Sequence, residues 1–139
     1  MNPDSLAAAG WQRLEVDGFS GLAGPIWMHR DESGGRTAGL IIDERHTNSH
    51  MGTLHGGALM TLADIALGWG ASEAIGGTHC ATISMQTHFV SVARIGEFVV
   101  CRPEVVRTSP QLVFMRGLMT VGERNVASVE GIWKVLAPR

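Results

Sequence analysis

The sequence lacks the features that mark secreted and membrane-spanning proteins. Only two cysteines, Cys80 and Cys101, occur among 139 residues, which is too few for a disulfide framework. The longest largely apolar run, residues 56–63, is far shorter than the roughly 18 residues that a membrane span requires. Residues 1–5 carry no basic region followed by an apolar core, so no secretory signal is expected. These absences predict a cytoplasmic protein with reduced thiols and no membrane partner.

An excess of charge of one sign is also missing. The formal net charge is −2 and no block of like charges occurs, so nothing favours nucleic acid as a partner. Hydrophobic residues make up 45% and charged residues 17%, which is the balance of a folded chain. A chain of this length buries roughly 68–70% of its unfolded surface, as one domain does. We therefore predict a single domain over residues 1–139.

Three common enzyme signatures do not occur. The absence of a Gly-x-Ser-x-Gly motif argues against a hydrolase with a Ser-His-Asp triad. Neither a phosphate-binding P-loop nor a dinucleotide fingerprint within a βαβ unit is found. Catalysis by this chain would therefore depend on other residues, and no cofactor is predicted.

The first third of the chain alternates between short elements and breaks. Residues 5–14 predict a short helix inside an N-terminal extension of about residues 1–24. Residues 25–30 and 36–42 predict two strands that form an opening hairpin. Four residues are expected to break the chain between the helix and the hairpin: Gly18, Gly21, Gly24 and Pro25.

One long helix and four further strands are predicted for the rest of the chain. Residues 56–74 are rich in Ala, Leu and Met, and two glycines follow them. β-branched residues and alternation predict four strands, over residues 81–92, 97–107, 111–121 and 125–136. Their short connections predict antiparallel pairing of successive strands. The order predicts an α+β fold, in which a curved sheet of about six strands wraps around one long apolar helix.

The strand that follows the helix has a polar face. Period-two alternation places four side chains together: Thr82, Ser84, Gln86 and His88. This face either contacts solvent, lines a site or joins a second subunit. Because the strand is available for pairing across a two-fold axis, we predict an obligate dimer that associates further into a tetramer.

A single carboxylate lies within the apolar helix. Asp64 has no cationic neighbour three or four positions away on the helix, and an unpaired buried charge would cost several kcal/mol. Small Gly68 and Ala71 on the same face would leave space beside it, as a ligand cavity requires. Asp64 either bonds a neighbouring loop or solvent, or acts as nucleophile or general base in an apolar pocket. The second interpretation is favoured.

His55, Gly56 and Gly57 directly precede or begin the predicted helix. Free backbone N–H groups at a helix N-terminus can polarise a carbonyl, and glycines let a substrate approach the backbone closely. A tight turn into a helix would use the same residues. Their combination with Asp64, nine positions after His55, favours a catalytic site.

Residues 52–64, Gly-Thr-Leu-His-Gly-Gly-Ala-Leu-Met-Thr-Leu-Ala-Asp, resemble the signature of PaaI-type hotdog thioesterases. These are relatives of the phenylacetate-pathway and 4-hydroxybenzoyl-CoA thioesterases. Residues 82–97 are also similar to that family, and the resemblance covers about residues 48–135. It implies a hotdog fold and hydrolysis of an acyl-CoA to free acid and CoA. It also implies a dimer whose active sites lie between the subunits.

The resemblance further implies roles for individual residues. Asp64 would act as general base or nucleophile, and the Gly56 backbone N–H would polarise the thioester carbonyl. His55 would orient that turn, and Thr82 would assist the water or the carboxylate. The family's Asn corresponds to Asn48, but the spacing to Gly52 is one residue longer here, so that Ser49 or His50 could fill the position instead.

Substrate contacts are expected from a second group of residues. On the helix these are Gly57, Met60 and Gly68. Guanidinium groups pair well with phosphate, so four arginines are candidates for the CoA phosphates: Arg94, Arg102, Arg107 and Arg116. Arg94 and Arg107 are preferred among them. The sequence does not define the acyl group.

Three other functions stay open. A non-catalytic hotdog module that binds acyl-CoA is the alternative from another class, although a binder would gain little from a buried carboxylate. A metal-dependent hydrolase could use His46, His50 and His55, but these fall in a loop without a cysteine, and no metal site is predicted. A hotdog dehydratase is the weaker enzyme alternative.

Overall fold

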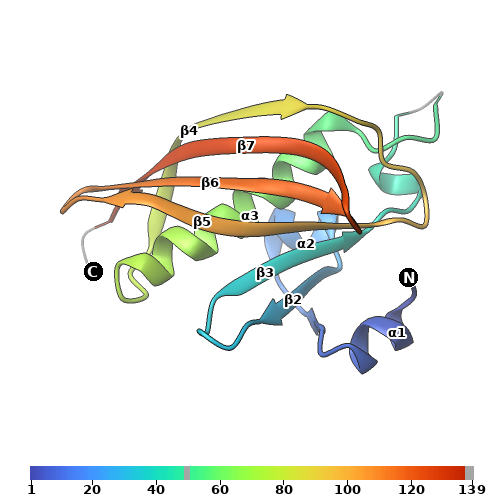
Figure 1. Ribbon diagram of the computed structural model, residues 1–139, viewed down its shortest axis with the longest axis horizontal. Coiled ribbons are helices and arrows are strands. Elements are labelled where there is room, and N and C mark those ends of the chain that lie inside the picture. The colour runs from blue at the N-terminus through green and yellow to red at the C-terminus, as the bar shows by residue number, and fades with distance from the viewer. Residues whose placement is uncertain (49–50, 137–139) are drawn as a thin grey trace.

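The computed structural model describes residues 1–48 and 51–136 (Figure 1). Its helices are α1 (Pro3–Ala8), α2 (Gly18–Ala23) and α3 (Gly56–Ala74), with a 3-10 turn, η1 (Glu44–His46). Its strands are β1 (Gln12–Leu14), β2 (Ile26–Arg30), β3 (Arg36–Ile41), β4 (Cys80–Phe89), β5 (Phe98–Thr108), β6 (Leu112–Val121) and β7 (Arg124–Val135).

The strands form one antiparallel sheet in the order β1-β2-β3-β5-β6-β7-β4. The sheet curves around α3, which packs across its inner face (Figure 1). The predicted α+β architecture is therefore confirmed. The sheet has seven strands rather than about six because residues 12–14, which we expected to be helical, pair with β2.

The N-terminal segment differs from the prediction. Asn2 begins α1 through a capping box with Ser5, and the helix ends at Ala8, shortly before Gly10 (φ 91°). Residues 18–23, where glycines were expected to break the chain, form the short helix α2. Gly21 is required there by close packing, because a Cβ at this position would lie 2.1 Å from the Val16 carbonyl oxygen.

α3 has the predicted ends and is buried on most sides. His55 caps its first turn by accepting a hydrogen bond from the Gly57 N–H at Nδ1 (2.8 Å). The helix ends before Gly76 and Gly77, both in the left-handed region. Leu62 and Leu67 are fully buried in the main core, which fills the space between α3 and the sheet. No helix in the described part of the chain is long and apolar enough to cross a membrane.

β4 lies at the far edge of the sheet, beside β7, and the predicted pairing with β5 is wrong. Residues 90–97 carry the chain from that edge to β5. Hydrogen bonds fix the crossing, because the Val90 N–H donates to the Val126 carbonyl (2.9 Å) and the Leu54 N–H donates to the Ala93 carbonyl (2.8 Å). A connection of this length spans two strands without a crossover helix.

A bulge at Ile83 divides β4. Thr82 lies opposite Trp133, and Ser84 lies opposite the next residue of β7, so Ile83 has no partner of its own. Thr82 therefore shares the inner face with buried Trp133, while Ser84 and His88 lie on the outer face. The expectation that Thr82 belongs to one polar face with Ser84 and His88 is wrong, since the bulge breaks the alternation.

The outer face of the sheet carries a second apolar cluster. Leu6, Trp27 and Phe98 are buried there and Trp11 packs against them. Gly39 makes this packing possible, because a Cβ at that position would lie 2.2 Å from Cζ of Phe98. The N-terminal residues thus cover the outer side of β2, β3 and the start of β5.

Candidate active site

Asp64 faces β4 from the middle of α3. Its Oδ1 accepts a hydrogen bond from Thr82 Oγ1 at 2.5 Å. The bulge at Ile83 permits this contact because it keeps Thr82 on the inner face. Asp64 is half-buried and forms no ion pair with any described residue. Its second oxygen is therefore available to a water molecule or a substrate.

A cavity of about 570 Å³ opens beside this pair. Asp64, Thr82, Gly68 and Trp133 line it. A Cβ at Gly68 would lie 3.6 Å from Trp133 Nε1, an ordinary contact distance, so glycine leaves added room at this point. Ala71, which we also expected beside the carboxylate, is fully buried in the core instead. A cleft with both polar and apolar walls, in which Thr82 holds Asp64, can place an acyl group next to a reacting carboxylate.

The N-terminal part of the chain completes the cavity. Ser20 of α2 lines it together with Trp69 of α3. Arg36 also lines it, with its guanidinium 4.9 Å from the centre of the Trp69 ring and paired with Glu73. The sequence does not identify Ser20 or Arg36, because only the packing of α2 and β3 against α3 brings them to the site.

The N-terminus of α3 offers a free backbone donor. The Gly57 N–H is occupied by His55, whereas the Gly56 N–H donates to no acceptor among the described residues. His55 holds the turn in place, because its own N–H also donates to the His46 carbonyl at 2.7 Å. The ring of Phe89 lies beside this turn, 3.2 Å from where a Cβ of Gly56 would be.

Gly56 and Asp64 are too far apart to act on one carbonyl within a single chain. They are eight positions apart on one helix, which separates them by about 12 Å along its axis. Neither Gly56 nor Gly57 lines the cavity beside Asp64, and Met60 does not line it either. The structure therefore brings together only Asp64, Thr82 and Gly68 of the residues expected at the site.

The position that corresponds to the family's Asn falls in the loop before α3. Asn48 is half-buried, and its backbone N–H donates to the Thr53 carbonyl at 2.9 Å. It does not line the cavity beside Asp64. The two alternatives, Ser49 and His50, lie outside the described residues.

The expected phosphate ligands are widely separated. Arg94 precedes β5 and Arg107 lies near its other end, so the 11 residues of this strand place them roughly 30 Å or more apart. Arg102 and Arg116 lie on the outer face, and Arg116 pairs with Glu104 at 2.8 Å. These arginines do not form one phosphate site within a single chain.

The two thiols are poor candidates for a nucleophile. Cys80 lines the cavity, but burial raises its pKa. Cys101 is fully buried, and burial raises its pKa to about 12. A thiol that stays protonated at neutral pH reacts slowly.

The histidines before α3 stabilise their loop. His46 is buried; its Nδ1 accepts a hydrogen bond from the Asp43 N–H (3.0 Å), which leaves Nε2 to donate to the Ala23 carbonyl (2.5 Å). His55 caps α3, and His50 lies outside the described residues. Within residues 1–48 and 51–136, no three His, Cys, Asp or Glu side chains gather as a metal site requires.

Known proteins resemble the chain over most of its length. The model of the family described as "Thioesterase superfamily" matches residues 51–128. The chain belongs to the thioesterase superfamily. A Pseudomonas aeruginosa protein named "Putative esterase PA0474" is 34% identical to this thioesterase over 113 residues, which cover 81% of this chain and 84% of that protein. Both matches identify it as a thioester hydrolase.

Solved structures share the fold of this thioesterase. Zebrafish thioesterase superfamily member 2 has a TM-score of 0.77 at 21% identity, over 88% of this chain and 89% of its own. The Bacillus halodurans protein BH2602, crystallised with CoA, has a TM-score of 0.75 at 23% identity, over 98% and 89%. A mutant of the phenylacetic acid degradation protein PaaI from Thermus thermophilus has a TM-score of 0.67 at 21% identity, over 96% and 99%. The hotdog architecture is thereby confirmed.

Proposed function

We propose that this thioesterase hydrolyses acyl-CoA thioesters, with Asp64 as the reacting carboxylate. The observation that carries the proposal is the hydrogen bond from Thr82 to Asp64 at the edge of a cavity with both polar and apolar walls. The cavity would hold the acyl group, and Thr82 would fix the direction of the carboxylate. The CoA bound to BH2602, a protein of similar fold, supports CoA as the thiol part of the substrate.

Two routes fit this arrangement. As a general base, Asp64 takes a proton from water, whose oxygen attacks the thioester carbon, and the tetrahedral intermediate expels the CoA thiolate. As a nucleophile, Asp64 attacks the carbon itself, releases the thiolate and forms a mixed anhydride that water then cleaves. In both routes, a backbone N–H at a helix N-terminus would stabilise the oxyanion.

A dimer would supply the missing oxyanion donor. Because Gly56 and Asp64 of one chain are about 12 Å apart, we infer that each site combines Asp64 of one subunit with Gly56 of the second. β4 pairs with β7 on one side only, so its other edge is open. Exposed apolar side chains on and beside it, Ile83 (55%), Val90 (58%) and Val92 (50%), suit a two-fold contact. Further association into a tetramer is part of the same proposal.

Release of CoA thiol from acetyl-, octanoyl-, palmitoyl- and benzoyl-CoA tests the proposed activity. We expect hydrolysis of at least one of these classes, and its loss in Asp64→Asn. A non-catalytic acyl-CoA-binding module would instead bind members of the panel in calorimetry and release thiol from none. Hydrolysis that survives in a folded Asp64→Asn variant would contradict the role of Asp64 while leaving the activity in place.

A further inference from the structure

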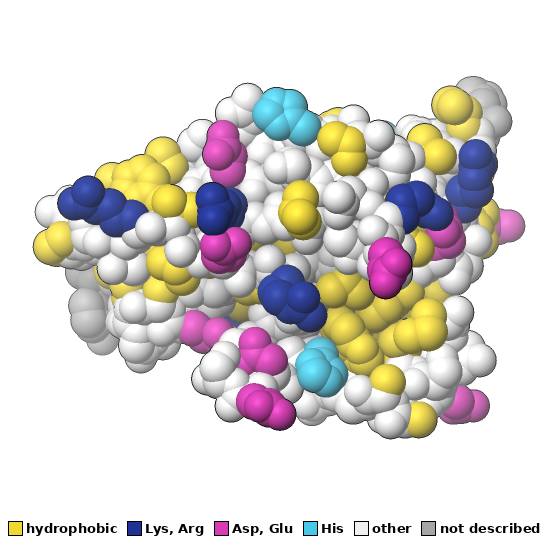
Figure 2. Space-filling view, viewed as in Figure 1, with side chains coloured by type: hydrophobic (Ala, Val, Ile, Leu, Met, Phe, Trp, Pro, Cys, Tyr) yellow, Lys and Arg dark blue, Asp and Glu magenta, His cyan; other side chains and the backbone are white. Residues whose placement is uncertain are grey.

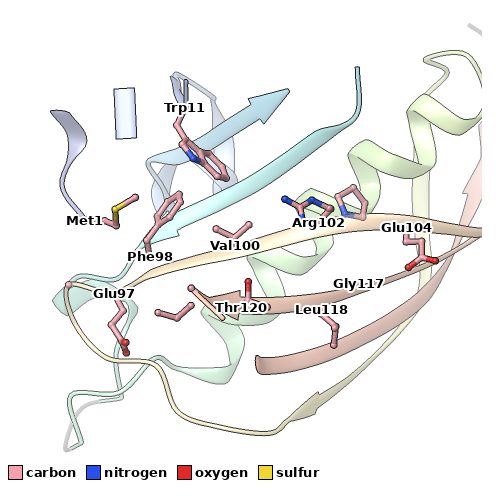
Figure 3. Close-up of a pocket in the computed structure, with 14 residues that line it drawn as sticks. Met1, Trp11, Glu97, Phe98, Val100, Arg102, Glu104, Gly117, Leu118 and Thr120 are labelled. Atoms are coloured by element: carbon pink, nitrogen blue, oxygen red, sulfur yellow. The ribbon is translucent and has the colours of Figure 1, made fainter. Parts of the chain in front are cut away.

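A second cavity lies on the outer face of the sheet, so the sheet itself separates it from Asp64. Its volume is about 1020 Å³, compared with about 570 Å³ beside Asp64. Apolar side chains gather around this hollow in Figure 2. In Figure 3, Trp11 points toward Phe98 and Val100. The rings of Trp11 and Phe98 meet edge-on with their centres 4.9 Å apart, so each helps to fix the other in the wall.

One positive charge in this cavity has no partner. The lining carboxylates of Glu97 and Glu104 each bind an arginine outside the cavity at 2.8 Å. The Arg102 guanidinium forms neither an ion pair nor a hydrogen bond with any residue in the described ranges. Asp31 is nearby, but its carboxylate accepts from Ser33, a bond that lowers its pKa together with a smaller effect of Arg102. The Arg102 guanidinium is therefore free to pair with an anion in this cavity.

We propose that this outer cavity binds a carboxylic acid with an apolar tail. The carboxylate pairs with Arg102, since a guanidinium is suited to two parallel hydrogen bonds with it. The tail lies between Trp11 and Phe98 and over Val100. The space is at the upper end of the roughly 300–1,000 Å³ of known small-molecule sites, so it accepts a medium-length chain.

The acid released by thioester hydrolysis belongs to this class of ligand. A product acid that bound in the outer cavity would not block Asp64. The idea that the bound acid is the reaction product rests on the proposed function, whereas binding of a carboxylic acid to the cavity does not. A dimer joined through β4 leaves the cavity open, because β7 separates β4 from β5 and β6, which form the floor.

The positions of the tryptophans make a site-specific test possible. Trp11 lines the outer cavity, Trp69 and Trp133 line the cavity beside Asp64, and Trp27 is buried in the second cluster. The four indole N–H signals of the 15N-labelled full chain, assigned with Trp→Phe variants, are followed as sodium decanoate or decanol is added. Decanoate should shift the Trp11 signal saturably, with an affinity at least about tenfold above that of decanol.

Two variants test the role of the cation. Arg102→Met should lower the affinity for decanoate, measured from the Trp11 signal, by about tenfold. It should change the affinity for decanol by less than about twofold. Lys134→Met is the matched control, because it removes an exposed cation of β7 outside the cavity, and it should leave both affinities unchanged.

Several results would overturn the proposal. A Trp11 signal that stays fixed up to the solubility limit of decanoate, while Trp69 and Trp133 move, would assign all binding to the cavity beside Asp64. Equal affinities for decanoate and decanol would show that Arg102 does not bind the carboxylate. A Trp11 signal that broadens with protein concentration, alongside a tetramer in ultracentrifugation, would show that a second copy covers this face. Failure of the proposed catalysis would appear only in the thiol-release assay, which keeps the two outcomes distinct.

Discussion

Thr82 Oγ1 lies 2.5 Å from Asp64 Oδ1, although the residues belong to a strand and a helix and are 18 positions apart. A single hydroxyl reaches only one carboxylate oxygen. The contact therefore fixes the direction of the side chain and leaves Oδ2 open to water or to a thioester carbon.

Replacing the carboxylate by an amide should stop the reaction while leaving the site assembled. Asp64→Asn should lower kcat by at least ~10²-fold, because an amide neither deprotonates water nor attacks a thioester. Thr82 can still donate to the amide oxygen, so the dimer and the affinity for acyl-CoA should persist in ultracentrifugation and calorimetry. Asp17→Asn is the matched control, since Asp17 lines the same cavity and its side chain makes no capping bond. Near-normal turnover in a folded Asp64→Asn variant would make the carboxylate structural.

The Thr82 hydroxyl should contribute to turnover separately from the methyl group. Hydrogen bonds to charged groups contribute roughly 1.5–3 kcal/mol, and exposure at this site reduces the effect to about 1–2 kcal/mol. Thr82→Val should therefore lower kcat about tenfold, and Thr82→Ser should retain most of it. Equal losses in both variants, measured by thiol release, would assign the effect to packing.

Adding bulk at the start of α3 should damage catalysis more than folding. A Cβ at Gly57 would lie 3.0 Å from His55 Nδ1, so Gly57→Val should displace the capping ring. Loss of a helix cap costs about 0.5–2 kcal/mol of unfolding free energy, whereas loss of an oxyanion donor lowers kcat by ~10²-fold or more. Urea unfolding and thiol release measure the two effects on one sample. Unchanged turnover in Gly57→Val would show that the oxyanion donor lies elsewhere than in this turn.

A mixed dimer should recover activity if each site uses two subunits. Asp64→Asn and Gly57→Val chains, each inactive alone, would form one intact site in every mixed dimer. Random pairing should give about a quarter of the wild-type activity, because half of the dimers are mixed and half of their sites are intact. Co-expression with two affinity tags isolates the mixed species. Activity that stays at the level of the separate variants would indicate that both groups act within one chain.

The buried thiol of Cys101 predicts a loss of stability in alkali. Burial raises its pKa from 9.0 to about 12, so above pH 9 the unfolded chain releases a proton that the folded chain keeps. The contribution is fully present below pH 9, and the free energy of unfolding should fall by up to ~1.4 kcal/mol per pH unit between pH 9 and pH 12.

Cys101→Ala should flatten that dependence in urea unfolding at pH values on both sides of pH 9. The chain contains no tyrosine, so no phenol titrates in this window, and Cys80 and Lys134 are the same in both proteins. The variant should also be less stable at neutral pH, by about 1 kcal/mol, because a buried sulfur atom is removed. Parallel pH profiles for the two proteins would contradict the prediction.

Local sequence signals predicted the parts of the site that are themselves local. Composition and the flanking glycines define residues 56–74, and the uncharged surroundings of Asp64 in that stretch mark it without any knowledge of the fold. The expected place of β4 was wrong because chain order does not determine which strand becomes its neighbour. The bulge at Ile83 has no sequence signature, so alternation alone gave Thr82 the wrong neighbours on the sheet.

The walls of both cavities depend on long-range packing. Arg36 and Ser20 reach the site beside Asp64 from β3 and α2, and Trp11 reaches the outer cavity from the segment before β1. These residues form no sequence motif, because their spacing in the chain does not show that they lie close together in the folded structure. The resemblance begins only near residue 48 and does not extend to this part of the chain.

The position of β4 also means that the strand carrying Thr82 finds its partner, β7, only at the end of synthesis. Cys80 pairs with Val135, 55 positions later, so α3 and β4 leave the ribosome before their neighbouring strand exists. Pairing at such separation slows folding and leaves apolar residues that the folded sheet buries, such as Leu67 of α3, uncovered for longer. A chain truncated within β7 by proteolysis or early termination would keep Asp64 on its helix and lose the support of the strand that carries Thr82. Damage remote in sequence would then disrupt the site together with the part of the core that β7 supplies, since the buried side chains of Val129 and Trp133 lie on that strand.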